Sequence, residues 1–128
     1  MKYEIKYKPA FSAIFVTLEP GERIIAEAGA MASMDSQVTI KTELSGDFLS
    51  ALAKKFFGGE SLFVNIFSNE TKQYVNLVLT QSVVGDIAEI ELHGKDMYFQ
   101  PGAYIASTPG VKMGVRWAGF SSWFAGEG

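Results

Sequence analysis

Hydrophobic and polar residues alternate along most of this chain with a period of two, which is typical of β-strands with one buried face. Near the N-terminus, Tyr3, Ile5 and Tyr7 alternate with charged residues. Similar patterns predict further strands over 13–18, 24–26, 31–32, 37–43, 62–67, 74–79 and 87–92. Short strands at close spacing indicate an all-β fold, either a sandwich or a rolled double-stranded β-helix.

The segments 62–67 and 74–79 are the clearest neighbouring strands in this pattern. The link between them, Ser68-Asn69-Glu70-Thr71-Lys72, carries the polar side chains that favour turns. We therefore expect these two strands to pair with each other as a β-hairpin.

One segment between Gly46 and Gly58 departs from the strand pattern. Its apolar residues recur at helical spacing, namely Phe48, Leu49, Leu52, Ala53 and Phe56. Asp47 lies at the start, and Lys54 and Lys55 lie near the end, as the helix dipole favours. The sequence therefore predicts one short helix near residues 47–57.

A glycine framework occurs twice along the chain. The matched pairs are Gly21 with Gly94, Gly29 with Gly102, Gly59 with Gly126, and Glu60 with Glu127. A repeated framework predicts the same strand-and-turn unit built twice. We expect a single β domain over 1–128, made of two related units at about 10–80 and 83–128. The second unit lacks a counterpart of the 62–67 strand, so we expect a fragment of a longer repeat protein.

Four motifs together resemble a known family. They are Glu19-Pro20-Gly21-Glu22, Ala28-Gly29-Ala30-Met31, Phe57-Gly58-Gly59-Glu60-Ser61-Leu62-Phe63 and Gln100-Pro101-Gly102-Ala103. Across essentially all of its length, the chain resembles the N-terminal portion of the mitochondrial biogenesis (altered inheritance of mitochondria) family. The resemblance implies an all-β fold like that of the tryptophan RNA-binding attenuation protein (TRAP-like). It supplies no catalytic residues, and it links eukaryotic members to organisation of the mitochondrial inner membrane.

The composition describes a globular domain and excludes several kinds of site. The 128 residues are 48% hydrophobic and 20% charged, which is sufficient for a packed core. The chain has no cysteine, which excludes disulfides, thiolate metal sites and catalytic thiols. The N-terminal segment has no apolar core of a signal peptide, and no apolar run is long enough to cross a bilayer. We therefore expect a cytoplasmic protein.

The charge balance argues against nucleic acid as a partner. The chain has 14 acidic and 11 basic residues, giving a formal net charge of −3. Proteins that bind nucleic acid normally carry a basic surplus, because neutralising phosphates dominates their affinity.

Few residues offer catalytic or metal-binding chemistry. His93 is the only histidine, and one imidazole cannot supply a histidine-rich metal site, so no cofactor or metal is expected. Glu60 and Glu127 could act as an acid–base pair only if the fold brought them together. The alternative is that each glutamate is structural and follows a glycine turn.

Two segments concentrate aromatic and basic side chains. The candidate partner-binding residues are Phe48, Lys54, Lys55, Phe56, Arg116, Trp117, Phe120 and Trp123. Tryptophan with lysine or arginine is favoured at membrane interfaces and partner-binding protrusions. The alternative is that these side chains cap the β units and are buried, since apolar stripes at helical spacing usually face a core.

The sequence therefore predicts a non-enzymatic β-scaffold that forms homo-oligomers through open sheet edges and binds a protein or membrane partner. The second hypothesis is a small-ligand or RNA-binding module of the ring-forming TRAP-like type, although the acidic charge disfavours RNA. An enzyme using Glu60, Glu127 or His93 is the third, and it would need a deep pocket that contains two of them.

Overall fold

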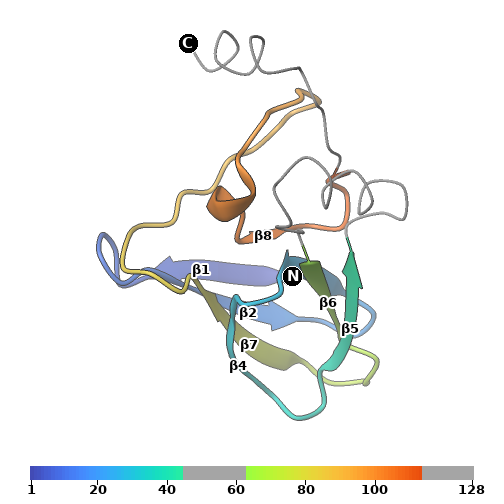
Figure 1. The fold of residues 1–128 in the computed structure, drawn as a ribbon. Helices are drawn as coiled ribbons and strands as arrows, with labels where there is room; N and C mark the ends of the chain where they lie inside the picture. The colour runs from blue at the N-terminus through green and yellow to red at the C-terminus, as the bar shows by residue number, and fades with distance from the viewer. Residues whose placement is uncertain (45–62, 114–128) are drawn as a thin grey trace, which may run out of the picture.

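The computed structural model of the chain describes residues 1–44 and 63–113 (Figure 1). This part contains eight strands in two four-stranded sheets, and every pair of neighbouring strands is antiparallel. The predicted all-β class is therefore confirmed, whereas the TRAP-like detail stays a prediction. The helix predicted near residues 47–57 lies outside the described residues.

The first sheet contains the N-terminal strand at one edge. Its strands in spatial order are β1 (Lys2–Lys6), β2 (Ala13–Leu18), β7 (Val75–Thr80) and β4 (Met31–Met34). The ladder places Ile5 opposite Ile14 and Val16 opposite Leu77, so apolar residues of neighbouring strands share one face. In Figure 1 the labels of this sheet gather to the left of β5 and β6.

The second sheet has a similar size. Its strands in spatial order are β5 (Thr39–Leu44), β6 (Phe63–Ser68), β3 (Arg23–Glu27) and the short β8 (Ala106–Ser107). A single 3-10 turn, η1 (Pro101–Ala103), precedes β8. The chain therefore returns from its C-terminal part to pair with β3 near the N-terminus.

The predicted hairpin of the strands at 62–67 and 74–79 is wrong. β6 pairs with β5 and β3, while β7 pairs with β2 and β4, so the two strands belong to different sheets. Where the chain changes sheet, the Asn69 side-chain nitrogen donates to the Leu18 carbonyl oxygen, which ties the link to the end of β2. The link has the predicted turn chemistry but carries the chain between layers.

The strand predicted over 87–92 is also wrong, because no strand is assigned to this segment. Side-chain contacts hold it beside β1 instead: Lys8 Nζ donates to the Ile87 carbonyl oxygen at 2.8 Å. The Tyr3 hydroxyl donates to the Glu89 carboxylate at 2.7 Å. Ala88 and Ile90, which alternation would place together on the apolar face, are both exposed, so the pattern here does not correspond to a buried face.

The core lies between the two sheets. Its most deeply buried side chains are Val16, Leu18, Phe67, Val75, Leu77 and Leu79. The residues of β2 and β7 occupy alternate positions, as strands with one inward face require, and Phe67 adds a ring from β6. The period-two pattern of the sequence therefore identifies the buried faces of β2 and β7 correctly.

The first glycine pair of the repeated framework forms turns in both places. Gly21 and Gly94 have positive φ angles of 85° and 79°. Each turn is closed by a backbone hydrogen bond, in 19–22 at 3.0 Å and in 92–95 at 2.8 Å. In the turn 19–22 only Gly21 has a positive φ, as in a type II turn. In the turn 92–95 both His93 and Gly94 have a positive φ, as in a type I′ turn.

The second glycine pair of the repeated framework also lies in turns. Gly29 and Gly102 lie in the turns 27–30 and 100–103, and each turn is closed by a 2.9 Å backbone hydrogen bond. The division into two related units stays a prediction, but these two turns occur at corresponding positions of both. The other framework residues, Gly59, Glu60, Gly126 and Glu127, lie outside the described residues.

Candidate functional site

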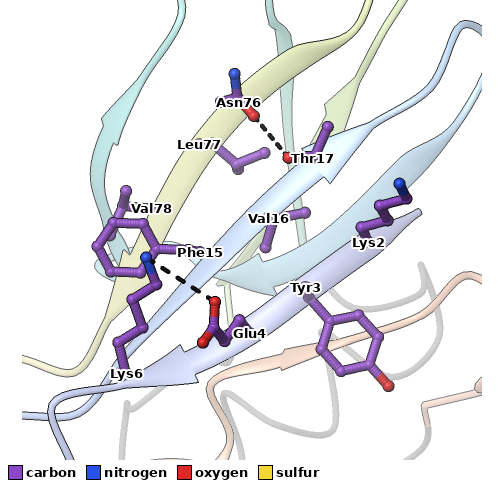
Figure 2. A pocket seen from close by; sticks show the side chains of 10 residues that line it. All are labelled: Lys2, Tyr3, Glu4, Lys6, Phe15, Val16, Thr17, Asn76, Leu77 and Val78. Carbon is purple, nitrogen blue, oxygen red and sulfur yellow. Dashed lines mark hydrogen bonds and ion pairs between the residues drawn. The ribbon is translucent and has the colours of Figure 1, made fainter.

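A shallow groove of about 410 Å³ crosses the outer face of the first sheet, over β1, β2 and β7 (Figure 2). Phe15 of β2 lies opposite Val78 of β7 in the ladder, and both line the groove. Charged side chains of β1 stand beside them, namely Lys2, Glu4 and Lys6. The groove therefore combines an apolar floor with a charged rim.

An aromatic and cationic cluster occupies one end of the groove. The Lys6 ammonium lies 4.5 Å from the centroid of the Phe15 ring, within the range of a cation–π interaction. Tyr7 packs edge-on against the same ring, with centroids 5.8 Å apart. Lys6 Nζ is also 3.9 Å from Glu4 (Figure 2). The ammonium thus covers one face of the Phe15 ring and has a carboxylate nearby.

Polar side chains form hydrogen bonds at the other end of the groove. Thr17 Oγ1 donates to Asn76 Oδ1 at 2.6 Å across β2 and β7. The Asn76 backbone N–H donates to the Asp35 carboxylate at 2.7 Å, which ties β7 to the turn after β4. Among the residues that the structure describes, Glu4 is the only carboxylate that lines the groove. The described lining therefore does not supply the pair of carboxyl groups that acid–base catalysis often uses.

Two loops meet beside this groove, at the end of the first sheet. We call residues 7–12 and 81–86 the two-loop tip. The loops are joined by backbone hydrogen bonds from Ser12 N to Gly85 O at 3.2 Å and from Gly85 N to Ala10 O at 2.6 Å. Their large exposed apolar residues are Tyr7, Phe11, Val83 and Val84, with exposed fractions between 64% and 72%. The two-loop tip thus presents apolar surface on a hydrogen-bonded base.

Asp86 fastens the two loops together. Its Oδ1 accepts hydrogen bonds from Ser12 Oγ at 2.6 Å and from the Ile87 N–H at 2.9 Å. Lys8 Nζ lies 3.1 Å from the same oxygen. The Ser12 hydrogen bond, followed by those from Lys8 and Ile87, outweighs desolvation and lowers the pKa of Asp86. The carboxylate is therefore held in its charged form.

Tyr7 has a backbone conformation that is unusual for a bulky residue. Its φ angle is 66°, in the left-handed region that favours glycine. The Tyr7 carbonyl oxygen accepts a 3.3 Å hydrogen bond from the Phe11 N–H, which closes the first loop on itself. Such strain persists only where surrounding contacts impose it, and it is common at binding sites.

None of the predicted partner-binding residues can be placed. Phe48, Lys54, Lys55, Phe56, Arg116, Trp117, Phe120 and Trp123 all lie outside the described residues. The apolar side chains of the two-loop tip were not predicted from the sequence. The adjacent pair Val83 and Val84, between Ser82 and Gly85, could have indicated exposed apolar surface, because two adjacent valines in a polar link cannot both face a core.

The described residues also locate the remaining candidates for chemistry. His93 lies in an exposed turn, with Nε2 2.8 Å from Glu91 Oε2. Within 1–44 and 63–113, no three histidine, aspartate or glutamate side chains are grouped so that they could hold a metal ion. No helix among these residues is long and apolar enough to span a bilayer.

Comparison with known proteins identifies a family over nearly the whole chain. The model of the family described as mitochondrial biogenesis AIM24 matches residues 3–128. No curated protein matches the chain in sequence.

A similar solved structure is the X-ray structure of a protein from Streptococcus pyogenes. It has 24% sequence identity and a TM-score of 0.43, and the alignment covers 63% of this chain. This chain spans 38% of the length of that protein.

Proposed function

This chain belongs to the mitochondrial biogenesis AIM24 family, and from that premise we propose that it is a non-enzymatic β-scaffold that self-associates and binds a partner. In this proposal the partner contacts the two-loop tip and the neighbouring aromatic end of the groove. A cytoplasmic location remains a prediction, with which the cysteine-free composition is compatible.

The observation that carries the proposal is the apolar surface of the two-loop tip. Isolated apolar side chains are common on protein surfaces, but contiguous ones usually mark an interaction site. Here Phe11 and Val84 belong to loops that backbone hydrogen bonds join directly. A surface that is already ordered loses less entropy on binding, which favours recognition of a partner.

The open ends of the sheets support self-association. In the described part of the chain, the first sheet ends on β1 and β4, and the second ends on β5 and β8. Edge strands offer backbone donors and acceptors that a second copy can pair with. Light scattering of the full chain tests this step, and a monomer at all concentrations would contradict it.

Site-specific photo-crosslinking tests partner binding. A benzophenone side chain is introduced at Val84, and in a control variant at Ser36, an exposed polar position in the turn after β4. We expect adducts of defined mass from position 84 and few from position 36. Equal crosslinking from both positions would show that the two-loop tip is not a preferred contact.

The groove supports a second candidate, a small-ligand module. Its apolar floor of Phe15 and Val78 lies beside charged side chains of β1, a combination that small-molecule sites use. RNA is a poorer fit, because Lys6 covers the Phe15 ring on which a base would stack and Glu4 lies between the lysines of β1. Retention of labelled RNA that falls steeply with salt would overturn this preference.

A further inference from the structure

The four strands that end the two sheets in the described part of the chain differ in how well their edges are protected. β4 is short, and its register with β7 is interrupted between Met31 and Ser33. β8 has only two residues. β1 has the segment 87–91 beside it, held there by hydrogen bonds from Tyr3 and Lys8. Short length, irregular register and a covering segment all hinder pairing with another chain.

Within residues 1–44 and 63–113, β5 has none of these protections (Figure 1). Its six residues, Thr39–Leu44, pair with β6 in an uninterrupted register, and no described strand lies on the other side. Residues 39–42 are all exposed. A regular strand with an open edge presents a row of backbone donors and acceptors to which a further strand can pair.

Ile40 adds apolar surface at this edge. It lies directly opposite Phe67 of β6, and residues opposite each other in a ladder share one face of the sheet. Phe67 is fully buried, whereas Ile40 is 38% exposed. A strand added beside β5 would shield Ile40 from water, which is favourable for an apolar side chain.

We propose that β5 pairs with β5 of a second copy of this chain, in an antiparallel ladder centred on Thr42. The second sheets of the two copies then form one continuous sheet across a two-fold axis. The inference rests on the proposed function and specifies the edge and the register of self-association.

The backbone restricts the registers that such a symmetric pair can have. Neighbouring residues of a strand direct their backbone hydrogen-bonding groups to opposite sides. Two copies of β5 therefore match only when the two-fold axis passes through a residue. Centres at Lys41 and Thr42 pair residues 39–43 and 40–44 of the strand, and every other centre pairs fewer.

Charge decides between these two centres. Centring on Lys41 would place the two copies of this lysine directly opposite each other, which destabilises a ladder. Centring on Thr42 places Lys41 of each copy opposite Glu43 of the other copy. It also places Ile40 opposite Leu44 of the other copy. The edge is thus complementary to itself in this one register, which favours a second copy over an unrelated strand.

Disulfide trapping in the full chain tests this register. The protein has no cysteine, so a single introduced thiol can bond only to its counterpart in a second copy. Thr42→Cys places the two thiols on either side of the two-fold axis, and we expect a covalent dimer under mild oxidation. Thr39→Cys is the matched control, because the same register separates the two copies of residue 39 by about 20 Å.

Two charge variants test the register without a covalent bond. Lys41→Glu and Glu43→Lys each place like charges opposite each other in the symmetric ladder. Each variant alone should self-associate about tenfold more weakly than the wild-type protein, because two attractive cross-strand pairs become repulsive. An equimolar mixture of the two should recover dimers of mixed composition, measured by native mass spectrometry, since each variant then meets its opposite charge.

The control for net charge uses the same arrangement of residues on β1. Lys2→Glu and Glu4→Lys change the charge of the chain by the same amounts at exposed positions of another edge strand. Each should self-associate as the wild-type protein does, and their mixture should show no preference for mixed dimers.

The outcomes separate this inference from the proposed function. A wild-type protein that is monomeric at all concentrations would overturn both. A wild-type dimer would keep self-association but reject the β5 edge if Thr42→Cys crosslinks no better than Thr39→Cys. The β5 edge is also rejected if the mixture of Lys41→Glu and Glu43→Lys gives no more mixed dimer than the β1 control pair.

Discussion

The side-chain nitrogen of Asn69 donates a 2.9 Å hydrogen bond to the carbonyl oxygen of Leu18, which joins the chain after β6 to the end of β2. The same nitrogen also donates to the Gln73 carbonyl oxygen at 2.6 Å. Its Oδ1 atom accepts from the Thr71 N–H at 2.9 Å. Asn69 therefore uses both ends of its amide to hold the link between the two sheets.

Replacing Asn69 with alanine should lower the free energy of unfolding by about 1–3 kcal/mol, because it leaves the buried Leu18 carbonyl oxygen without this donor. Urea unfolding measures the change. Asn76→Ala is the control, since Asn76 is exposed and its side chain makes a surface hydrogen bond with Thr17. Equal losses in both variants would show that the link does not depend on the Asn69 amide.

Replacing Gly85 with alanine should destabilise the protein by about 1–3 kcal/mol, the usual cost of a residue forced into a rare backbone conformation. The added Cβ would also displace Gln81 Nε2. Thermal unfolding measures the effect. Gly110→Ala is the control, because a Cβ there meets nothing within 4 Å and its φ is outside the glycine-favouring range. A Gly85→Ala variant as stable as Gly110→Ala would contradict this backbone conformation.

Acid should weaken the contact between the two loops through Asp86. Its pKa is lowered from the ordinary value of 3.8, mainly by the Ser12 hydrogen bond and then by Lys8. A lowered folded-state pKa means that the stabilisation is present above about pH 3.8 and is lost as the pH falls through the folded-state value. Melting temperatures from pH 7 to pH 2 should therefore fall less in Asp86→Asn than in the wild-type protein.

The control for this pH series is Asp96→Asn, at an exposed position outside the two-loop tip. It should retain the wild-type loss of stability in acid. If the melting temperature of Asp86→Asn falls in acid as much as that of the wild-type protein, other carboxylates control the transition.

Phe67 and Phe63 lie on the same strand and differ in burial, with exposed fractions of 0% and 43%. Phe67→Ala should cost about 3–5 kcal/mol, because it removes a fully buried ring from the core. Phe63→Ala should cost clearly less, since part of its ring is already in water. Chemical unfolding of both variants checks that the Phe67 ring is buried in the core and the Phe63 ring is not, and a reversed order would refute it.

The sequence predicts the strands well but not all of their partners. Alternation along Ala13–Leu18 and Val75–Thr80 identifies both strands and their buried sides. It carries no information about pairing, which here joins segments far apart in the chain. The hairpin prediction failed because the link at Asn69 had turn chemistry, and such chemistry serves a crossing between sheets equally well.

The candidate site was harder to predict for the same reason. Phe11 and Val84 are distant in sequence, and they come together only because Gly85 bonds to the first loop. Neither Phe11 nor Val84 has a sequence context that distinguishes it from an ordinary apolar residue. Gln81 Nε2 is buried without a hydrogen-bond partner in the described part of the chain. No sequence pattern predicts this, because an unpaired amide is a property of packing.

The order of strands in the two sheets has a consequence for synthesis of the chain. β2 pairs with the edge strand β1 on one side, but its other neighbour, β7, is synthesised much later. In the second sheet, β3 likewise cannot pair until β6 has been synthesised. At about 5–20 residues per second, the apolar β2 emerges several seconds before β7 is made. Nascent chains should therefore be most vulnerable to aggregation and chaperone capture before Thr80 leaves the ribosome, and should become protected once it has.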